Sequence, residues 1–319
     1  MVPLAAMPVR IGDLLWRVGC SALLAWAFWA MAWRYGDDAR RGFFAVASLL
    51  VLPVTLGTLR NGQTNLPLAA LFALALTWLG STPRRPVWSA AALCLAFVLK
   101  PIAIVPILLV GAFVRGMWWR LLIGLAFVAA LPFLSANPHY AAEQYVLGWQ
   151  KVIQVATPSR TMFADMHGAL IHLGFDPDQR LMMGVQLVLA VVTGCAGLAA
   201  RARFDDRRFV LALHLLSACY LMFANPRTEG VSYPIMAVPV AALACLWLGR
   251  DRRSAIGWAL LVITILLGTI HLITPPKDYI VRPLLAIMVW GWVVIESVCG
   301  SLVRGGDHPG STQADVPGS

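Results

Sequence analysis

Two polar sites interrupt a chain that is otherwise strongly apolar. The first is the run Arg60-Asn-Gly-Gln63-Thr-Asn65, and the second is Lys100-Pro101, which follows Asn65 by 35 residues. Guanidinium, amide and ammonium groups are costly beside a lipid core unless a ligand or another group satisfies them. Because both sites lie between long apolar runs, their positions predict a binding site.

The residue types in these two sites favour an anionic ligand. At a helix start, the positive charge of Arg60 opposes the helix dipole. An anion bound there, beside the free N–H groups, would stabilise the arginine side chain. The ammonium group of Lys100 suits a phosphodiester. Two structural alternatives stay open: Thr64 or Asn65 could cap the following helix, and Lys100 could extend outward along the apolar surface to reach water.

A second polar turn, Asn225 to Pro234, carries three further candidates. Arg227 could face an anion, while Glu229 or Tyr233 could bind a sugar hydroxyl of the ligand. Alternatively, Arg227 and Glu229 form an ion pair in solvent. His271 lies inside an apolar segment, where a lone histidine is expected to be a core residue.

Composition places the chain among membrane proteins that cross the bilayer several times. Of its 319 residues 60% are apolar and 13% are charged, a balance that soluble domains rarely show. The net charge of +10 does not indicate nucleic-acid binding, because the cations lie in short clusters between apolar runs. The chain has no Walker loop and no His-Glu-x-x-His, Gly-x-Ser-x-Gly or dinucleotide motif, so the sequence indicates no ATP-driven transport.

The six cysteines lie within or at the ends of apolar segments, and none has the spacing of a metal ligand. We therefore interpret them as packing residues and expect no disulfide framework, metal site or cofactor.

The apolar runs and their breakers predict an all-α fold, a polytopic transmembrane bundle of about eleven helices. Residues 1–304 would form one transmembrane domain, followed by a disordered cytoplasmic tail at 305–319. The predicted segments are 12–33, 43–59, 66–80, 87–99, 102–114, 121–135, 181–200, 209–223, 234–249, 255–273 and 284–300.

Basic residues predict the orientation of the bundle. Short connections on one side hold 15 of the 25 Lys and Arg residues and the other side holds eight, so the first side, with the C-terminus, would be cytoplasmic. This alternation favours two short helices meeting at Lys100-Pro101 over a single kinked helix across 87–114. Short or broken helices of this kind typically line a polar cavity.

The longest predicted connection, 136–180, would lie outside the cell, and a loop of this length is usually functional. It contains the candidates Asp165 and His167. A helical stripe in it, formed by Phe163, Met166, Leu170 and Leu173, fits either a helix along the outer membrane interface or packing beneath the loop.

The pattern Gly62-Gln63-x-Asn65 at the start of an apolar helix, followed by Lys100-Pro101 between the next two, resembles glycosyltransferase family 87 of the GT-C superfamily. That resemblance implies a plasma-membrane enzyme that transfers a hexose, often mannose, from a polyprenyl-phosphate donor to an extracytoplasmic lipid or glycan acceptor. Arg60 and Lys100 would hold the donor phosphate, and Gln63 and Asn65 would orient donor or acceptor. Loop 136–180 would cover the cavity and present the acceptor site.

The resemblance also implies an inverting mechanism in which an outside-loop carboxylate takes the proton of the acceptor hydroxyl. In GT-C enzymes this residue lies in the first outside loop, but here no Asp precedes Asp13. Eleven crossings put the N-terminus outside, so we expect either a start codon assigned too late or a shortened relative. Asp165 and Glu229 are the carboxylates that could substitute.

We expect the partners to be the lipid-linked donor, its acceptor and membrane lipids, with no nucleic acid. His167, Arg227 and Tyr233 are further candidates for substrate binding. The alternatives to an enzyme are a carrier or flippase for a lipid-linked or anionic substrate, or an inactive remnant.

Overall fold

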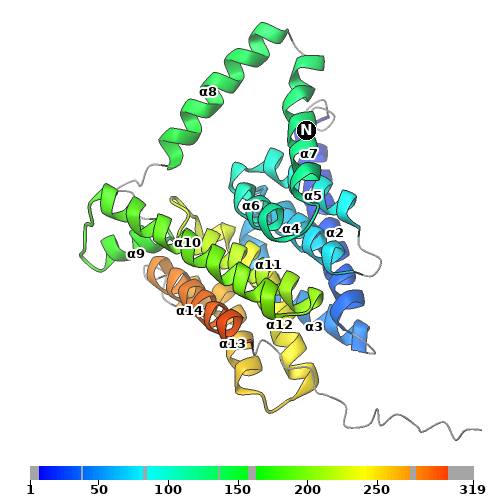
Figure 1. Cartoon of the computed structure of the whole chain (residues 1–319), viewed down its shortest axis with the longest axis vertical. Helices are drawn as coiled ribbons and strands as arrows, with labels where there is room; N and C mark the ends of the chain where they lie inside the picture. Colours follow the sequence, from blue (N-terminus) through cyan, green and yellow to red (C-terminus); the bar gives the residue numbers. More distant parts are fainter. Residues whose placement is uncertain are drawn as a thin grey trace, which may run out of the picture.

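The computed structural model describes residues 7–36, 39–81, 85–135, 137–156, 163–273 and 278–300, and all regular structure within them is helical (Figure 1). This confirms the predicted all-α class. The helices are α2 (Val9–Tyr35), α3 (Arg40–Arg60), α4 (Asn65–Gly80), α5 (Pro86–Leu99), η2 (Pro101–Ala103), α6 (Ile104–Phe113), α7 (Trp118–Ser135), α8 (Pro138–Ala156), α9 (Met166–His172), α10 (Gln179–Arg203), α11 (Asp206–Phe223), η3 (Gly230–Ser232), α12 (Pro234–Arg250), α13 (Ala255–Ile273) and α14 (Asp278–Cys299).

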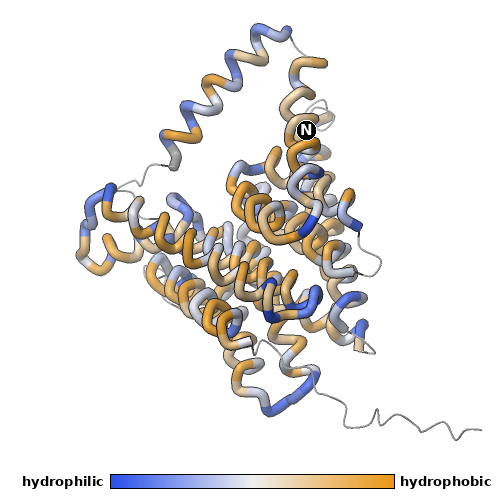
Figure 2. The backbone as a smooth tube through the Cα atoms, viewed as in Figure 1, coloured by the Kyte–Doolittle hydropathy of each residue, from blue (hydrophilic) through white to orange (hydrophobic). Residues whose placement is uncertain are grey.

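Each predicted apolar segment coincides with one of these helices. Among the described residues, α2, α3, α10, α13 and α14 are long and apolar enough to cross a membrane, and α4 to α7 and α12 are shorter apolar helices. Figure 2 shows hydrophobic residues along most of the bundle and hydrophilic residues mainly at its connections. The chain is therefore a multi-pass membrane protein, whereas helix length alone does not establish the predicted eleven crossings.

Helix α4 forms the centre of the bundle. It is apolar on all sides and almost every residue in it is buried, because α2, α3, α5, α11 and α12 surround it. A helix without a polar face is stable only inside a protein or a membrane. Its first residue, Asn65, is therefore held within the bundle rather than at a freely exposed loop.

The predicted break at Lys100-Pro101 is confirmed. Lys100 has an extended backbone (φ −151°, ψ 127°) that ends α5, and η2 and α6 begin after it. Proline disfavours the helical conformation in the residue before it, so the dipeptide itself explains the break.

A tight contact joins α3 and α13 beside the site described below. A Cβ atom built on Gly268 of α13 would lie 2.7 Å from the Cβ of Pro53 and 2.8 Å from the backbone nitrogen of Val54. Only glycine allows the two backbones to approach this closely.

The long connection contains two helices, α8 and α9. Helix α9 packs beside α14, and Phe163, Met166 and Leu170 are half-buried. Of the two predicted alternatives for this stripe, these positions favour packing beneath the loop and not a helix along the membrane interface. Residues 157–162 of the loop and the predicted tail at 305–319 lie outside the described part of the chain.

Candidate functional site

A chain of hydrogen bonds joins the two polar sites that the sequence singled out. Lys100 Nζ donates to Asn65 Oδ1 (2.7 Å), Asn65 Nδ2 donates to Gln63 Oε1 (2.8 Å), and Gln63 Nε2 donates to Glu229 Oε2 (3.0 Å). The sequence correctly predicted that residues 63–65 and Lys100 belong together. It did not predict that Glu229 ends this chain.

Asn65 is the structural centre of the network. Its side chain is fully buried, and its Nδ2 also lies 3.2 Å from both the Val231 carbonyl and the Ser232 hydroxyl. The residue therefore fastens the start of α4 to η3. Neither Thr64 nor Asn65 caps α4 through its side chain, so the capping alternative is wrong.

Lys100 is half-buried at the inner end of this network. Burial lowers its pKa, and the nearby Glu229 carboxylate opposes that shift. The ammonium group thus has both a hydrogen-bond acceptor and a nearby opposite charge within the protein. Lys100 therefore bonds within the protein and does not extend outward to water, as one of the predicted alternatives required.

A cavity of about 610 Å³ lies on the other side of Glu229. Among the described residues that line it, four have ionisable side chains: Arg60 from α3, Glu229 before η3, His271 from α13 and Arg282 from α14. The rest of the wall is formed by Pro53, Val54, Leu56, Gly57, Gly230, Val231, Gly268, Thr269 and Leu272. The cavity therefore combines two arginine side chains and a carboxylate with a largely apolar wall.

This lining corrects the prediction that Arg60 and Lys100 face one anion. Both residues lie at the same end of the bundle, but Lys100 is not among the described residues that line the cavity. Its ammonium group bonds Asn65 behind Glu229 instead. The second cation in the cavity is Arg282.

Arg282 and His271 are the site residues that sequence reasoning missed. Arg282 is 7% exposed, with its guanidinium 5.7 Å from the centre of the Tyr233 ring and Nη2 3.4 Å from His271 Nδ1. A guanidinium only donates, so this contact is a hydrogen bond in the tautomer that leaves Nδ1 without a proton. The expectation that His271 is a core residue is wrong, because its side chain is exposed on the cavity wall. The available signal was an arginine one turn inside an apolar helix.

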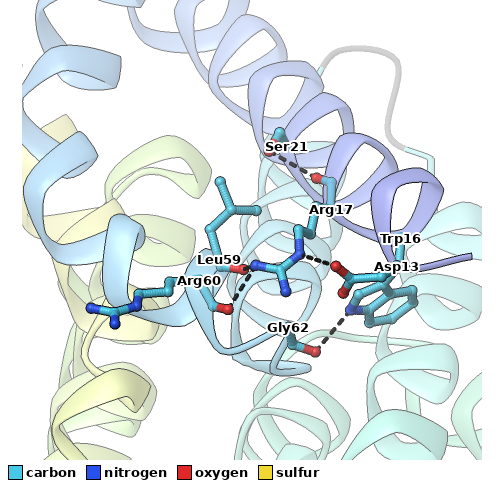
Figure 3. A network of polar contacts seen from close by, with 7 residues as sticks. All are labelled: Asp13, Trp16, Arg17, Ser21, Leu59, Arg60 and Gly62. Carbon is cyan, nitrogen blue, oxygen red and sulfur yellow. Dashed lines mark hydrogen bonds and ion pairs between the residues drawn. The ribbon is translucent and has the colours of Figure 1, made fainter. Parts of the chain in front are cut away.

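The turn that carries Arg60 is held by the first turns of α2 (Figure 3). Arg17 Nη1 donates to the carbonyls of Leu59 and Arg60, both at 2.6 Å, and Arg17 Nε pairs with Asp13 at 2.8 Å. Trp16 Nε1 donates to the Gly62 carbonyl at 2.9 Å. Gly62 has a positive φ of 61°, which glycine adopts at little cost. The Arg60 side chain extends away from these contacts (Figure 3).

We expect Arg17→Ala to destabilise the folded protein by about 1–3 kcal/mol, because it removes charge-assisted bonds to two carbonyls at the end of α3. The measurement is thermal unfolding in detergent. Arg10→Ala is the matched control, since Arg10 is exposed in the first turn of the same helix. Equal unfolding temperatures for the two variants would contradict a holding role for Arg17.

Asp165 is positioned as a structural cap. Its Oδ1 accepts from the Gly168 N–H (2.7 Å) and its Oδ2 from the Arg227 N–H (2.8 Å), and the residue is 4% exposed. Burial raises the pKa of Asp165, and backbone N–H groups of Gly168, Arg227 and Thr228 oppose that shift. The second bond stabilises Arg227 at a φ of 61°, a left-handed conformation that is unfavourable for arginine.

Asp165→Asn is expected to lower stability by about 1–3 kcal/mol, because one amide oxygen cannot accept all the N–H donors that the carboxylate satisfies. The measurement is thermal unfolding of the variant and of the parent protein. Unchanged stability would contradict the capping role of Asp165.

The remaining candidates support the loop around Asp165. Tyr233 is fully buried and its hydroxyl donates to the Ala164 carbonyl at 2.9 Å. Arg227 Nη2 donates to the Gln154 carbonyl at 3.1 Å, so its guanidinium does not pair with Glu229 as the solvent alternative required. His167 is buried in α9, and its Nε2 has no hydrogen-bond partner among the described residues. None of the described residues from the long loop lines the cavity.

Comparison with known families gives one match, to the model of glycosyltransferase family 87 over residues 1–226. The match includes the Arg60–Asn65 run and Lys100, whereas Glu229, His271 and Arg282 lie beyond it. Searches of curated proteins and of solved structures found no match. Because the family model covers more than two thirds of the chain, this protein belongs to glycosyltransferase family 87.

Proposed function

We propose that the protein transfers a hexose, with mannose the first sugar to test, from a polyprenyl-phosphate donor to a hydroxyl of a lipid or glycan acceptor. The observation that carries this proposal is the cavity in which Arg60 and Arg282 share a largely apolar wall with one exposed carboxylate, Glu229. A lipid-borne phosphate needs both cations and apolar surface, and the acceptor hydroxyl needs a base.

The donor phosphate would bind between Arg60 and Arg282. Arginine presents several N–H donors in a planar fork that matches phosphate oxygens, and His271 Nε2–H offers one further donor. The first isoprene units would lie on the apolar wall, where Leu56 and Leu272 are 54% and 72% exposed. These two side chains extend the wall toward the lipid-facing surface of the bundle.

Glu229 would act as the general base. The acceptor oxygen attacks the anomeric carbon from the face opposite the phosphate while its proton passes to the Glu229 carboxylate. The bond from the anomeric carbon to the phosphate oxygen breaks, and its electron pair stays on the phosphate. Arg60 and Arg282 stabilise that developing charge. The result is inversion, as in GT-C enzymes generally.

The hydrogen-bonded chain would hold the base in position. Gln63 bonds the carboxylate of Glu229, Asn65 holds Gln63, and Lys100 holds Asn65. In this proposal Lys100 acts through electrostatic attraction to Glu229 rather than through the donor phosphate. We leave Asp165 out of the chemistry because backbone N–H groups occupy both of its oxygens.

In the membrane arrangement that accompanies this proposal, eleven helices cross the plasma membrane and the cavity opens to the extracytoplasmic side. The basic connections, such as Arg201 to Arg208 and Arg250 to Arg253, would then lie in the cytoplasm. This orientation follows the distribution of positive charge between the two sets of connections.

The test is sugar transfer by the purified protein in proteoliposomes. Synthetic polyprenyl-phosphate-mannose is supplied with a panel of alkyl glycosides, and the products are identified by mass spectrometry. We expect a new glycosidic product and free polyprenyl phosphate in equal amounts. A nucleotide-linked mannose in place of the lipid donor is the control and should give none. Movement of the lipid donor between leaflets without any product would instead support a carrier.

A further inference from the structure

Helix α8 differs from the other long helices because it stands apart from the bundle (Figure 1). It has 19 residues, Pro138–Ala156, and is therefore about 28 Å long. Of its described side chains only Ala141 is buried. A helix with so little support from neighbouring helices needs another surface to cover its apolar residues.

Five large apolar residues of α8 form one face. Tyr145, Val146, Trp149, Val152 and Ile153 follow helical spacing and are 44%, 59%, 66%, 39% and 55% exposed. The opposite side is mainly polar, and its residues are His139, Glu143, Gln144, Gln150, Lys151 and Gln154, interrupted by Tyr140 and Leu147. This division is typical of a helix that lies along a membrane surface.

Two hydrogen bonds connect α8 with other elements of the described chain. Its first turns follow α7, and the Tyr145 hydroxyl donates to the Ala129 carbonyl of α7 at 2.8 Å. Near its last turn, the Gln154 carbonyl accepts from Arg227, two residues before Glu229 on the cavity wall. The helix is therefore connected to α7 near its middle and, at its last turn, to the turn that leads to Glu229.

The apolar face of α8 continues onto an exposed apolar surface of α7. The Tyr145 ring stacks on Phe133 with ring centres 5.7 Å apart. Phe127 and Leu134 of α7 are 63% and 79% exposed, and in a multi-pass membrane protein such a surface faces lipid. The occupant of the α8 face is therefore the same lipid that covers α7.

We propose that α8 lies in the membrane interface on the cavity side, with Tyr145, Val146, Trp149, Val152 and Ile153 inserted among the acyl chains of that leaflet. Trp149 suits this level of the membrane, because its ring is apolar and its N–H reaches water. Lys151 and Glu143 offset each other's charge, so the apolar area and not anionic lipid provides the attraction. This proposal goes beyond the proposed transfer reaction and needs only that the bundle spans a membrane.

The experiment measures the accessibility of nitroxide labels in the full-length protein. The six native cysteines are first replaced by serine or alanine, and unchanged thermal unfolding is the condition for continuing. Single cysteines are then introduced as two matched pairs on opposite faces of α8, Val146→Cys with Gln144→Cys and Val152→Cys with Gln154→Cys. Collision with lipid-soluble oxygen and with a water-soluble nickel chelate is compared for each label in neutral phosphatidylcholine vesicles.

We expect labels at 146 and 152 to favour oxygen over the nickel chelate by several-fold relative to labels at 144 and 154. A preference for nickel at all four positions would overturn the proposal, because α8 would then lie in water. Protection of 146 and 152 from both reagents would also overturn it, since protein would cover the face. The readout does not depend on sugar transfer, so an inactive protein with the expected pattern would contradict only the proposed function.

Discussion

Glu229→Gln is expected to slow sugar transfer by about 10²- to 10⁴-fold, the range that loss of a general base typically produces. The amide has nearly the same shape as the carboxylate and still offers an oxygen to Gln63 Nε2, so the loop should keep its position. Binding of the lipid donor should change little, because in the proposed site the phosphate contacts Arg60 and Arg282 and not Glu229. The measurements are initial transfer rates at saturating donor and the equilibrium affinity for a non-transferable donor analogue.

The matched control for this variant is Glu143→Gln. Glu143 is an exposed carboxylate of α8, away from the described lining of the cavity, and its replacement should leave the transfer rate unchanged. A Glu229→Gln protein that transfers at the parent rate would eliminate Glu229 as the base. Equal losses in both variants would point to an effect of surface charge.

Arg282→Ala is expected to lower the transfer rate by about 10²- to 10³-fold, the usual cost of losing one donor to charge that develops in the transition state. Arg282→Lys should recover only part of the rate, because lysine keeps the charge but not the planar fork. Arg60→Ala should raise the donor concentration needed for half-maximal rate, and we expect no folding defect because the Arg60 side chain is exposed. Initial rates over a range of donor concentrations separate these effects.

Two controls make the arginine experiment decisive. Thermal unfolding identifies any part of the Arg282→Ala effect that comes from its buried contact with His271 and Tyr233. Arg180→Ala removes an exposed arginine outside the described lining of the cavity and should have no effect on rate. If Arg60 and Arg282 bind one phosphate, the double variant should lose less than the two single losses combined. Full additivity would argue for separate ligands.

Local signals in the sequence were sufficient to predict the helices. Long apolar runs predicted the helices of the bundle because hydrophobic length and polar breakers act over neighbouring residues. Pro101 predicted the end of α5 for the same reason, because proline restricts the backbone of the preceding residue, Lys100. The boundaries extend further than predicted at α2 and α14, where polar first turns continue an apolar helix.

The candidate site could be predicted only in part. Gln63 lies just before α4, Asn65 is the first residue of α4, and Lys100 follows the last residue of α5. Their contact could be predicted because α4 and α5 are short and consecutive in the chain. Arg282 lies more than 200 residues after Arg60 in the chain, and its position depends on how α14 packs and rotates beside α11 and α13. No local pattern reports that rotation, and the same limit applies to the bond between the Arg227 N–H and Asp165, which joins residues far apart in the chain.

The sequence by itself therefore determined the helical membrane class, the segments and the polar groups that needed satisfaction, because each of these depends on the cost of placing a residue in lipid. Only the tertiary structure decided which of those groups are satisfied within the protein and which face a cavity. That choice depends on contacts between helices far apart in the chain, such as the close approach of Gly268 to Pro53, two residues of the cavity wall.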